Sequence, residues 1–448
     1  MITDLINYLK EKKVMILGFG REGISTYNLI RKYLKEQKLY IADKKENLIE
    51  ENDFLKNDKN VEIIVGENYL ENLEKYDIII KTPGVSFKGI DTSKFYNKIK
   101  SELELLLEFF KVKTIGITGT KGKSTTSSLI YKVLKDQNIE CMLLGNIGVP
   151  VFDYLDQIKE NMVLVLEMSS HQLEYMEKSP NISILLNIFE EHLDHYESFE
   201  KYAKAKCNIY KYQRKSDYFF YNIDNKTLKR LVKDNFAKTY KVSLTDMQEN
   251  DIYIKDDKIY FKDEIIYNKN EPRNLLGDYN LNNIMFVLGV AKILKLDLSK
   301  ATKSISEFKT LEHRLEYVGK YDDIDFYDNS IGTIPEATIE AVKALKNVNT
   351  LIIGGMDRNI DYTDFIKFIE ASNVENIICM PKTGHDIAKK IINKQTFIVD
   401  TMQEAVKMAK KVTQKGEICL LSPAAASYGY FKNFEEKGNI YKELVKRK

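Results

Sequence analysis

The chain has 448 residues, which is too long for one hydrophobic core and implies about three domains of roughly 150 residues each. Lysine and arginine together number 68 against 66 aspartates and glutamates, so the formal net charge is only +2. This balance argues against a general nucleic-acid-binding or membrane-binding surface.

Cysteine usage and the first segment both indicate a cytoplasmic protein. Cys141, Cys207, Cys379 and Cys419 are scattered without C-x-x-C spacing, which fits neither a zinc site nor a disulfide framework. The segment MITDLINYLKEKK lacks the apolar region of a signal peptide, and no apolar run approaches the ~18 residues needed to span a bilayer. We therefore expect a soluble cytoplasmic monomer that binds small molecules, not nucleic acid or membrane.

The first predicted junction is VMILGFGREG at residues 14–23, which reads as a strand, a glycine turn and a helix N-terminus. Asp43 follows about 20 residues later, after the apolar LYIA, as in a dinucleotide-binding fingerprint. The same helix N-terminus accepts any diphosphate, including that of a nucleotide sugar. The alternative is a tight turn without a ligand. Two further strands are expected in VEIIVGENYLENLEKYDIIIKTPG.

The second junction, TGTKGKSTT at residues 118–126, follows an apolar run and precedes apolar residues at helical spacing. Gly119 and Gly122 let backbone N–H groups turn inward, Lys123 can reach terminal phosphates, and Ser124 can offer a hydroxyl to Mg²⁺. The expected ligand is a nucleoside triphosphate. Position 117 is Ile where the common G-x-x-x-x-G-K-[ST] pattern has Gly. The alternative is a surface turn rich in Lys and Gly.

Two continuous apolar runs, MVLVLE (162–167) and SILLNI (183–188), are typical of strands buried on both faces. Glu167 follows the first run, and His192 lies in NIFEEHLDHY after the second. Ligands bind at the carboxyl ends of such strands, so these two side chains facing a phosphate loop could organise Mg²⁺. Taken alone, His192 fits a structural or exposed histidine, and Lys206 in YAKAK fits a solvated helical lysine.

The last third repeats the pattern with LIIGGMDRN (351–359) and with a further strand, EICLLSP. Strands that alternate with helical patterns predict parallel α/β sheets. The sequence therefore predicts an α/β protein of three nucleotide-fold-like domains, with boundaries at 1–111, 112–309 and 310–448.

The motifs TGTKGKSTT, EMSSHQLE, NIFEEHLDHY, YAKAK, GDYNLNN, LEHRLE and LLSPAAASYGYFKNFEEKGN stand in the order and approximate spacing of the Mur ligases. GNIG at 145–148 and the Thr82-Pro83-Gly84 turn strengthen this resemblance. It implies an N-terminal Rossmann-like UDP-binding domain, a central P-loop ATPase-like domain with a parallel sheet, and a C-terminal Rossmann-like amino-acid-binding domain. The implied activity, in peptidoglycan precursor synthesis, is ATP-dependent addition of glutamate to UDP-N-acetylmuramoyl-L-alanine through an acyl phosphate, with D-glutamate as the expected isomer.

The resemblance also implies roles for individual residues. Two magnesium ions are expected, and Lys206 matches the lysine that is carbamylated in this family. The metal and catalytic residues implied are Ser124, Lys123, Glu167, His192 and Lys206. ATP would be bound by Gly119, Thr120, Lys121, Gly122, Lys123, Ser124, Thr125, Asn280, Asn283, Arg314 and Asp328. The other substrates would be bound by Gly20, Arg21, Asp43, Thr82, Pro83, Gly84, Asn146, Ser169, Gln172, Thr333, Arg358, Ser427 and Phe434.

The sequence departs from the family pattern at several of these sites. Glu191 stands where Asp often precedes the metal histidine, and Tyr279 stands where His is common in GDYNLNN. In YDNSIGTIPEAT, Ile331 replaces a lysine, and the preceding Asp and Asn are transposed. Arg358 replaces another lysine, and an arginine can bind a carboxylate bidentately. The preferred amino acid, whether D-glutamate, L-glutamate or another, therefore stays open.

Three alternatives compete with this interpretation. An enzyme similar to folylpolyglutamate synthase would share the phosphate loop and the carbamylated lysine, but GFGREG and FKNFEEKGN argue against it. An NAD-dependent dehydrogenase would use the first glycine loop and leave TGTKGKSTT unexplained. A nucleotide-binding module without enzymatic activity is the third, and substrate-dependent phosphate release would exclude it.

Overall fold

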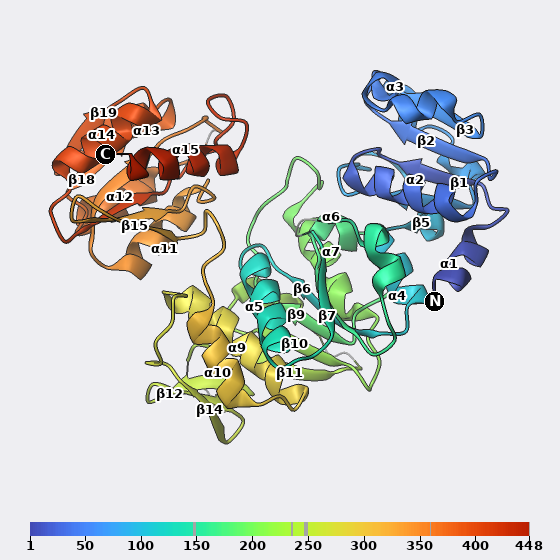
Figure 1. The fold of residues 1–448 in the computed structure, drawn as a ribbon, viewed down its shortest axis with the longest axis horizontal. Helices are drawn as coiled ribbons and strands as arrows, with labels where there is room; N and C mark the ends of the chain where they lie inside the picture. The colour runs from blue at the N-terminus through green and yellow to red at the C-terminus, as the bar shows by residue number, and fades with distance from the viewer. Residues whose placement is uncertain (147–148, 234–235, 246–249, 359, 448) are drawn as a thin grey trace. The chain divides into compact units, whose positions relative to one another are not determined.

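The computed structural model describes residues 1–146, 149–233, 236–245, 250–358 and 360–447 (Figure 1). The chain divides into two compact units. Unit 1 comprises Met1–Glu271 and Asn282–Ser306, and unit 2 comprises Pro272–Leu281 and Glu307–Lys448. Within the described ranges, no helix combines the length and apolar character that a bilayer crossing requires.

Unit 1 begins with a five-stranded parallel sheet in the order β3-β2-β1-β4-β5. Its strands are β1 (Val14–Leu17), β2 (Leu39–Asp43), β3 (Val61–Val65), β4 (Ile78–Lys81) and β5 (Ile99–Lys100). Its α-helices are α1 (Ile2–Leu9), α2 (Arg21–Tyr33), α3 (Leu48–Glu51) and α4 (Glu102–Phe109). Short 3₁₀ helices are η1 (Asp53–Asn57), η2 (Glu67–Leu70), η3 (Leu73–Lys75) and η4 (Tyr96–Lys98).

The strand order of this sheet reverses at β1. Val14 of β1 pairs with Leu39 of β2 on one side and with Ile78 of β4 on the other. Chain connections leave β1 in opposite directions at such a switch point, which opens a crevice outside the carboxyl ends of the strands. The predicted glycine loop, Asp43 and Thr82 all lie at this end of the sheet.

The second sheet of unit 1 has nine strands in the order β14-β13-β12-β11-β10-β9-β6-β8-β7. It is parallel from β7 to β12, and β12, β13 and β14 are antiparallel. Its strands are β6 (Lys113–Thr118), β7 (Cys141–Gly145), β8 (Val163–Glu167), β9 (Ile182–Leu185), β10 (Tyr218–Asn222), β11 (Lys238–Val242), β12 (Ile252–Lys255), β13 (Lys258–Phe261) and β14 (Glu264–Asn268). The helices around it are α5 (Lys123–Asp136), η5 (Val151–Gln157), α6 (Ser170–Leu173), α7 (Phe199–Lys211), α8 (Lys226–Leu231), α9 (Asp278–Ile293) and α10 (Leu298–Glu307).

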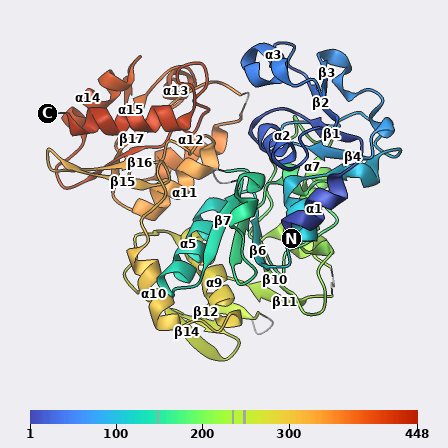
Figure 2. The same ribbon diagram turned by 45° about the vertical axis from the view of Figure 1, so that its right-hand side comes forward.

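Helix α5 follows the predicted phosphate loop and packs on β6, β7 and β8 (Figure 2). Leu129, Ile130, Val133 and Leu134 are all buried, at the i, i+1, i+4 and i+5 positions of one helical face. Burial of this face holds the N-terminus of α5 at the carboxyl end of β6.

One hydrophobic core joins the two sheets of unit 1. Leu106 of α4 belongs to the same buried cluster as Phe152 of η5 and Leu166 of β8. Because the apolar surface is continuous from the first sheet to the second, both belong to one compact unit. The domain boundary predicted at residue 111 falls inside this unit and stays a prediction.

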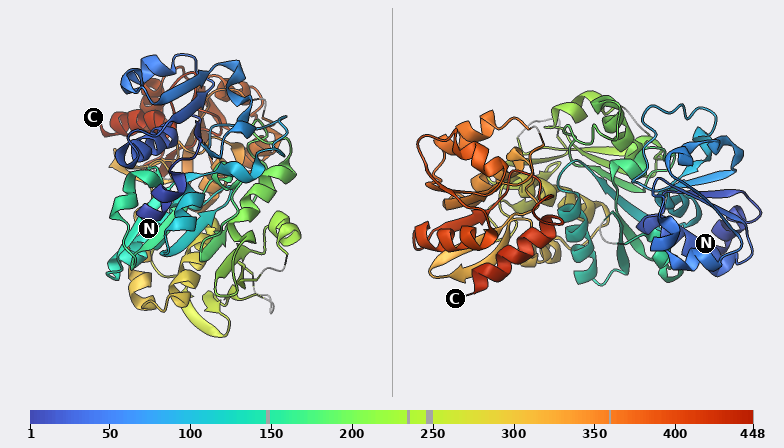
Figure 3. Two further views of the ribbon diagram at one scale, coloured as in Figure 1. Left: turned by 90° about the vertical axis from the view of Figure 1, so that its right-hand side faces the viewer. Right: turned by 90° about the horizontal axis from the view of Figure 1, so that it is seen from above.

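Unit 2 is built on a six-stranded sheet in the order β15-β16-β20-β17-β18-β19, which is parallel except for the edge strand β15, antiparallel to β16. Helices cover both faces (Figure 3). Leu351 and Ile353 pack with α11 to α13, whereas Ile352 packs with α14 and α15. The strands are β15 (Glu316–Tyr321), β16 (Ile324–Asp328), β17 (Val348–Ile353), β18 (Asn376–Cys379), β19 (Gln395–Ile398) and β20 (Ile418–Leu421). The helices are α11 (Pro335–Leu345), α12 (Thr363–Ala371), α13 (Thr383–Ala388), α14 (Met402–Val412) and α15 (Phe434–Lys446).

Candidate active site

The predicted phosphate loop connects β6 to α5. Gly122 has a φ of 87° and directly precedes the first helical residue, Lys123. A positive φ at this position turns the backbone N–H groups of the loop and of the first helical turn toward one point. The Lys123 ammonium folds back over the loop and donates to the carbonyls of Gly119 (2.9 Å) and Thr120 (3.1 Å). The loop has the geometry that an anion site requires, and phosphate binding by its residues stays a prediction.

The segment after β9 holds this loop in shape. The Asn187 side chain accepts from the Lys121 backbone N–H (2.9 Å) and donates to the Lys121 carbonyl (3.0 Å). The Thr120 hydroxyl accepts from the backbone N–H of Phe189 at 2.9 Å. Sequence reasoning assigned no role to Asn187, although its place directly after the apolar run of β9 was a usable signal.

Glu167 lies at the end of β8, next to β6 in the sheet, and is 1% exposed. Asn146 Nδ2 donates to its Oε1 at 2.8 Å, and the Ser127 hydroxyl lies 3.5 Å from its Oε2. Gly145 has a φ of 101°, and a Cβ built there would lie only 2.3 Å from the Glu167 carbonyl oxygen. Glycine therefore allows the close strand approach that brings Asn146 to Glu167.

Lys206 lies on α7, is 2% exposed, and donates from Nζ to the Gly119 carbonyl at 3.0 Å. Burial, followed by the nearby positive charge of Lys123, holds the Lys206 pKa well below its usual value. The charges of Glu191 and Glu167 oppose this effect. A lysine that lacks a proton is a nucleophilic amine, so its chemistry differs from that of a surface lysine.

His192 follows β9 and stands on the other side of β6 from Glu167. Its Nε2 lies 3.7 Å from Glu191 Oε2, and Glu191 also pairs with Lys121 at 2.9 Å. The His192 ring lies 4.8 Å from the His171 ring. Burial is the main cause that lowers the pKa of His192, and it also lowers the pKa of His171 to about 3. A neutral imidazole of this kind can be a metal ligand.

A cavity of about 400 Å³ lies at the switch point of the first sheet. Asp43 Oδ2 accepts from the Phe19 backbone N–H at 2.6 Å, which ties the end of β2 to the glycine loop after β1. The volume falls in the range of small-molecule sites. Seven predicted substrate residues line it: Gly20, Arg21, Asp43, Thr82, Pro83, Gly84 and Asn146.

The two other predicted substrate residues of unit 1, Ser169 and Gln172, form the capping box of α6. Gln172 Nε2 also donates to Glu22 Oε1 at 2.7 Å. Of the GNIG and LIIGGMDRN motifs, residues 147, 148 and 359 lie outside the described residues.

In unit 2, the predicted amino-acid pocket residues follow adjacent parallel strands. Thr333 follows β16, Arg358 follows β17 and Ser427 follows β20. A bridge between Met356 and Ala426 ties together the loops that carry Arg358 and Ser427. Arg358 is exposed, whereas the Ser427 hydroxyl is buried and has no hydrogen-bond partner among the residues that the structure describes.

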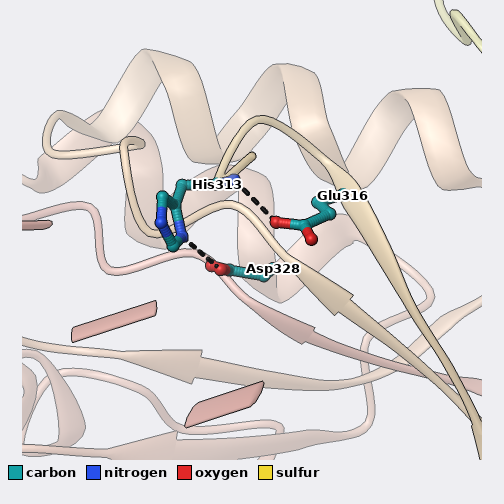
Figure 4. A group of neighbouring side chains, drawn as sticks. All are labelled: His313, Glu316 and Asp328. Atoms are coloured by element: carbon teal, nitrogen blue, oxygen red, sulfur yellow. Dashed lines mark hydrogen bonds and ion pairs between the residues drawn. The ribbon is translucent and has the colours of Figure 1, made fainter. Parts of the chain in front are cut away.

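His313, Glu316 and Asp328 bring their side-chain ligand atoms within 4.8 Å of one another in unit 2 (Figure 4). His313 Nδ1 lies 2.7 Å from Asp328 Oδ2, and Glu316 Oε2 accepts from the His313 backbone N–H at 2.8 Å. Lys442 neutralises Glu316 at 3.0 Å. A Cβ on Gly438 would lie 2.2 Å from His313 Nδ1, so helix α15 closes the space that a metal ion would need.

One predicted ATP residue, Asp328, belongs to this network, and another, Arg314, is its neighbour in the sequence. Arg314 is half-buried directly after His313, and Asp328 is fully buried, with its carboxylate accepting from the Ser330 backbone N–H at 2.8 Å. Phe434 begins α15, with its ring 6.0 Å from that of His313. The sequence motif LEHRLE gave a role only to Arg314 and missed His313.

Asn280 and Asn283, two of the predicted ATP-binding residues, are both buried on α9. Asn280 Nδ2 donates to the Leu276 carbonyl at 2.8 Å within unit 2. Asn283, in unit 1, approaches the phosphate loop, since a Cβ on Gly122 would lie 2.7 Å from its Oδ1.

Comparisons with known proteins match two domains of one enzyme family. Residues 117–291 match the family described as Mur ligase middle domain, and residues 313–425 match the Mur ligase glutamate ligase domain. The chain is 33% identical to the UDP-N-acetylmuramoylalanine--D-glutamate ligase of Caldanaerobacter subterraneus subsp. tengcongensis, with 98% of each chain covered. It is 34% identical to the enzyme of the same name from Lachnoclostridium phytofermentans, with 97% of this chain and 98% of the other covered.

Solved structures show the same fold at low sequence identity. MurF ligase from Thermotoga maritima in complex with ADP is 16% identical, with a TM-score of 0.61 over 98% of this chain and 96% of the other. UDP-N-acetylmuramate-alanine ligase from the same organism is 19% identical, with a TM-score of 0.59 over 97% and 99%. The full-length identity to curated relatives, together with the α/β fold, shows that this chain belongs to the Mur ligase family.

Proposed function

We propose that this protein is an ATP-dependent amide ligase that joins D-glutamate to UDP-N-acetylmuramoyl-L-alanine during peptidoglycan precursor synthesis. The observation that carries the ligase chemistry is the convergence of Lys123 and Lys206 on the carbonyl of Gly119 in the phosphate loop. The names of the full-length relatives supply the two substrates. The four cysteines are unpaired, which suits a cytoplasmic enzyme.

ATP is proposed to bind with its phosphates on the loop from Gly119 to Thr125. Backbone N–H groups at the start of α5 face this position, and the helix dipole adds partial positive charge. Asn187 and Phe189 fix the loop before the ligand arrives, so little ordering is needed on binding. Arg314 is the proposed phosphate-binding residue of unit 2, and Asn280, Asn283 and Asp328 are the proposed nucleoside-side residues.

The donor set near the loop fits magnesium. Glu167 is buried, with Asn146 and the Ser127 hydroxyl at its two carboxylate oxygens. A buried carboxylate without a cation is costly, and Mg²⁺ is commonly held by one or two carboxylates together with substrate phosphates. Ser124, Glu167, His192 and a carbamate on Lys206 would hold the ions. When bound, Mg²⁺ would neutralise charge on the transferred phosphoryl group.

Carbamylation of Lys206 is supported by its burial and its lowered pKa. The uncharged amine can attack CO₂, forming a nitrogen-carbon bond and releasing one proton, which leaves an anionic carbamate. An anion at this position would accept from neighbouring donors and attract cations, whereas an ammonium would repel them. Thr120 and Tyr202, whose hydroxyls lie 2.9 Å apart beside the loop, are near enough to shape this pocket.

The proposed reaction has two steps. The substrate carboxylate oxygen attacks the γ-phosphorus of ATP, and ADP leaves. The glutamate amine then attacks the acyl phosphate, loses a proton, and expels inorganic phosphate as the amide bond forms. Lys123 stabilises the charge on the transferred group, because phosphoryl transfer depends on positioning and electrostatics more than on covalent help from the protein.

The cavity of the first sheet is the proposed site of the uridine diphosphate group, with the α2 N-terminus facing the diphosphate. Ser169 and Gln172 are proposed to contact the muramyl end. In unit 2, the buried hydroxyl of Ser427 and the guanidinium of Arg358 are proposed to bind the side-chain carboxylate of D-glutamate, beside Thr333 and Phe434.

The test is release of phosphate from ATP by purified protein with UDP-N-acetylmuramoyl-L-alanine, comparing D-glutamate, L-glutamate and D-aspartate, with the product mass measured. Turnover and a product one glutamyl residue heavier are expected with D-glutamate. Turnover with another amino acid in place of D-glutamate would refute the proposed amino-acid specificity and would still support an ATP-dependent ligase. No substrate-dependent phosphate release with any amino acid would remove the proposed function.

A further inference from the structure

Two carboxyl groups lie behind the cavity of the first sheet and have no part in the function described above. Glu22 is in the first turn of α2, directly after Arg21, and lines the cavity. Glu102 is the first residue of α4 and is 2% exposed. The two residues are distant in sequence and meet through one face of α2.

Thr26 shows how the two carboxyls approach each other. It lies one helical turn after Glu22, so the two side chains share a face of α2. The Thr26 hydroxyl donates to Glu102 Oε1 at 2.9 Å, while Glu102 Oε2 is buried without a hydrogen-bond partner among the described residues. On its other side, Glu22 Oε1 accepts from Gln172 Nε2 at 2.7 Å. Both carboxyls are thus held in place.

The charged groups around the pair are predominantly acidic. Asp153 faces Glu102 and accepts from the Ser25 hydroxyl at 2.6 Å. Lys81 is buried near Glu22, but its ammonium lies 3.7 Å from Glu174, which also faces His195 at 3.2 Å. Arg21 is exposed and also faces Glu22. Four carboxyls therefore share two nearby basic groups, and burial lowers the pKa of one of them, Lys81.

Burial is the main cause that raises the pKa of both carboxyls, and the charge of Glu22 raises that of Glu102 further. Glu102 is buried and Glu22 is half-buried at the cavity wall, and two interacting carboxyls placed there ionise together only at a large electrostatic cost, so the pair favours holding a proton. A diphosphate in the cavity would bring two further negative charges toward Glu22. The lowest-energy response is protonation of Glu22, which also creates an O–H donor for a phosphate oxygen.

We infer that Glu22 and Glu102 form a proton-holding pair that takes up a proton from solvent when the diphosphate of a nucleotide substrate enters the adjoining cavity. This inference rests on the proposed function, because it requires that the cavity bind a diphosphate. Nucleotide affinity then decreases as the pH rises above the Glu22 pKa, by up to about tenfold per pH unit.

The experiment is isothermal titration calorimetry of UDP-N-acetylmuramoyl-L-alanine into the full-length protein at pH 7, in buffers of different ionisation enthalpy. The slope of the observed enthalpy against the buffer enthalpy counts the protons taken up. We expect an uptake of about 0.5 to 1 proton for the wild type. In Glu22→Gln, whose amide cannot titrate, the slope should fall close to zero.

Glu104 offers a matched control. It is also fully buried, two residues beyond Glu102, but its Oε1 pairs with Lys100 at 2.8 Å and it does not line the cavity. Glu104→Gln should therefore keep the wild-type proton uptake. If Glu22→Gln fails to fold, the pH dependence of wild-type affinity between pH 6 and 8 replaces it, and a pH-independent affinity would overturn the inference.

The outcomes separate the inference from the proposed function. Binding without proton uptake, or uptake that persists in Glu22→Gln, would refute the inference about the Glu22–Glu102 pair and would leave the proposed ligase function unaffected. Absence of any binding removes the proposed nucleotide site and the inference with it.

Discussion

Replacement of Lys206 by Met should separate stability from activity. Methionine has a similar length and no charge, so the change removes one hydrogen bond, from Nζ to the Gly119 carbonyl at 3.0 Å. A hydrogen bond of this kind contributes about 1 kcal/mol, and the Gly119 carbonyl still accepts from Lys123 at 2.9 Å. Removal of a buried amine acts in the opposite direction, because its desolvation opposes folding. The free energy of unfolding should therefore change by no more than about 1 kcal/mol or increase.

The effect on catalysis should be far larger. Without the Lys206 amine no carbamate can form, and a loss of about 10³-fold or more in kcat corresponds to at least about 4 kcal/mol of transition-state stabilisation. Urea unfolding followed by circular dichroism measures the first quantity, and ADP release under saturating substrates measures the second. Lys204→Met, at an exposed position on the same helix, is the control and should leave both unchanged.

Chemical rescue sharpens this test. In Lys206→Ala, the shortened side chain leaves room for a small carboxylate, so added formate or acetate should restore part of the activity. Wild-type-like activity of Lys206→Met would refute the reasoning. A loss of more than about 3 kcal/mol in the free energy of unfolding of Lys206→Met would also refute it, since the role of Lys206 would then be to stabilise the fold.

Three further predictions concern other parts of the chain. Gly145→Ala should destabilise the protein by about 2 to 5 kcal/mol, because Gly145 has a positive φ and an added Cβ would clash with the Glu167 carbonyl. Gly89→Ala is the control and should cost about 1 to 2 kcal/mol, because Gly89 has a φ of 80° but open space around it. Thermal unfolding measures both losses of stability, and equal losses would contradict the geometry. Burial lowers the pKa of Lys437 from 10.5 to about 7, so between these pH values the unfolded chain binds a proton that the native state has released. The free energy of unfolding should therefore rise with pH, by up to about 5 kcal/mol over this range. Urea unfolding from pH 7 to 9 should show this rise in the wild type and a smaller one in Lys437→Met. Arg358→Ala should raise the KM for glutamate about 10-fold to 100-fold and leave the KM for ATP unchanged. Initial-rate measurements test this, and an unchanged KM for glutamate would show that Arg358 does not bind glutamate.

The sequence predicted the local parts of the fold well. VMIL coincides with β1, the apolar run before TGTKGKSTT lies within β6, and the expected helix begins inside this motif, at Lys123. These features depend on apolar periodicity and on glycine at a turn, which act over a few neighbouring residues. Glu167 was placed correctly at the end of a strand for the same reason, since the continuous apolar run ends there.

Contacts between distant segments could not be read from the sequence. Asn187 fixes the phosphate loop only because β9 lies next to β6, and Glu22 meets Glu102 only because α2 packs near α4. His313 and Asp328 pair across a turn and a strand, with Gly438 of another helix packed against them. Such arrangements follow from the tertiary fold and leave no periodic signal in the chain.

The most direct test of the central claim follows an oxygen atom through the reaction. UDP-N-acetylmuramoyl-L-alanine with both carboxylate oxygens replaced by ¹⁸O is incubated with the protein, ATP, magnesium and D-glutamate, and the released phosphate is analysed by mass spectrometry. If the phosphate loop transfers the γ-phosphoryl group to that carboxylate, each phosphate released will carry one ¹⁸O atom. Phosphate without the label, formed while the amide product accumulates, would contradict activation through an acyl phosphate.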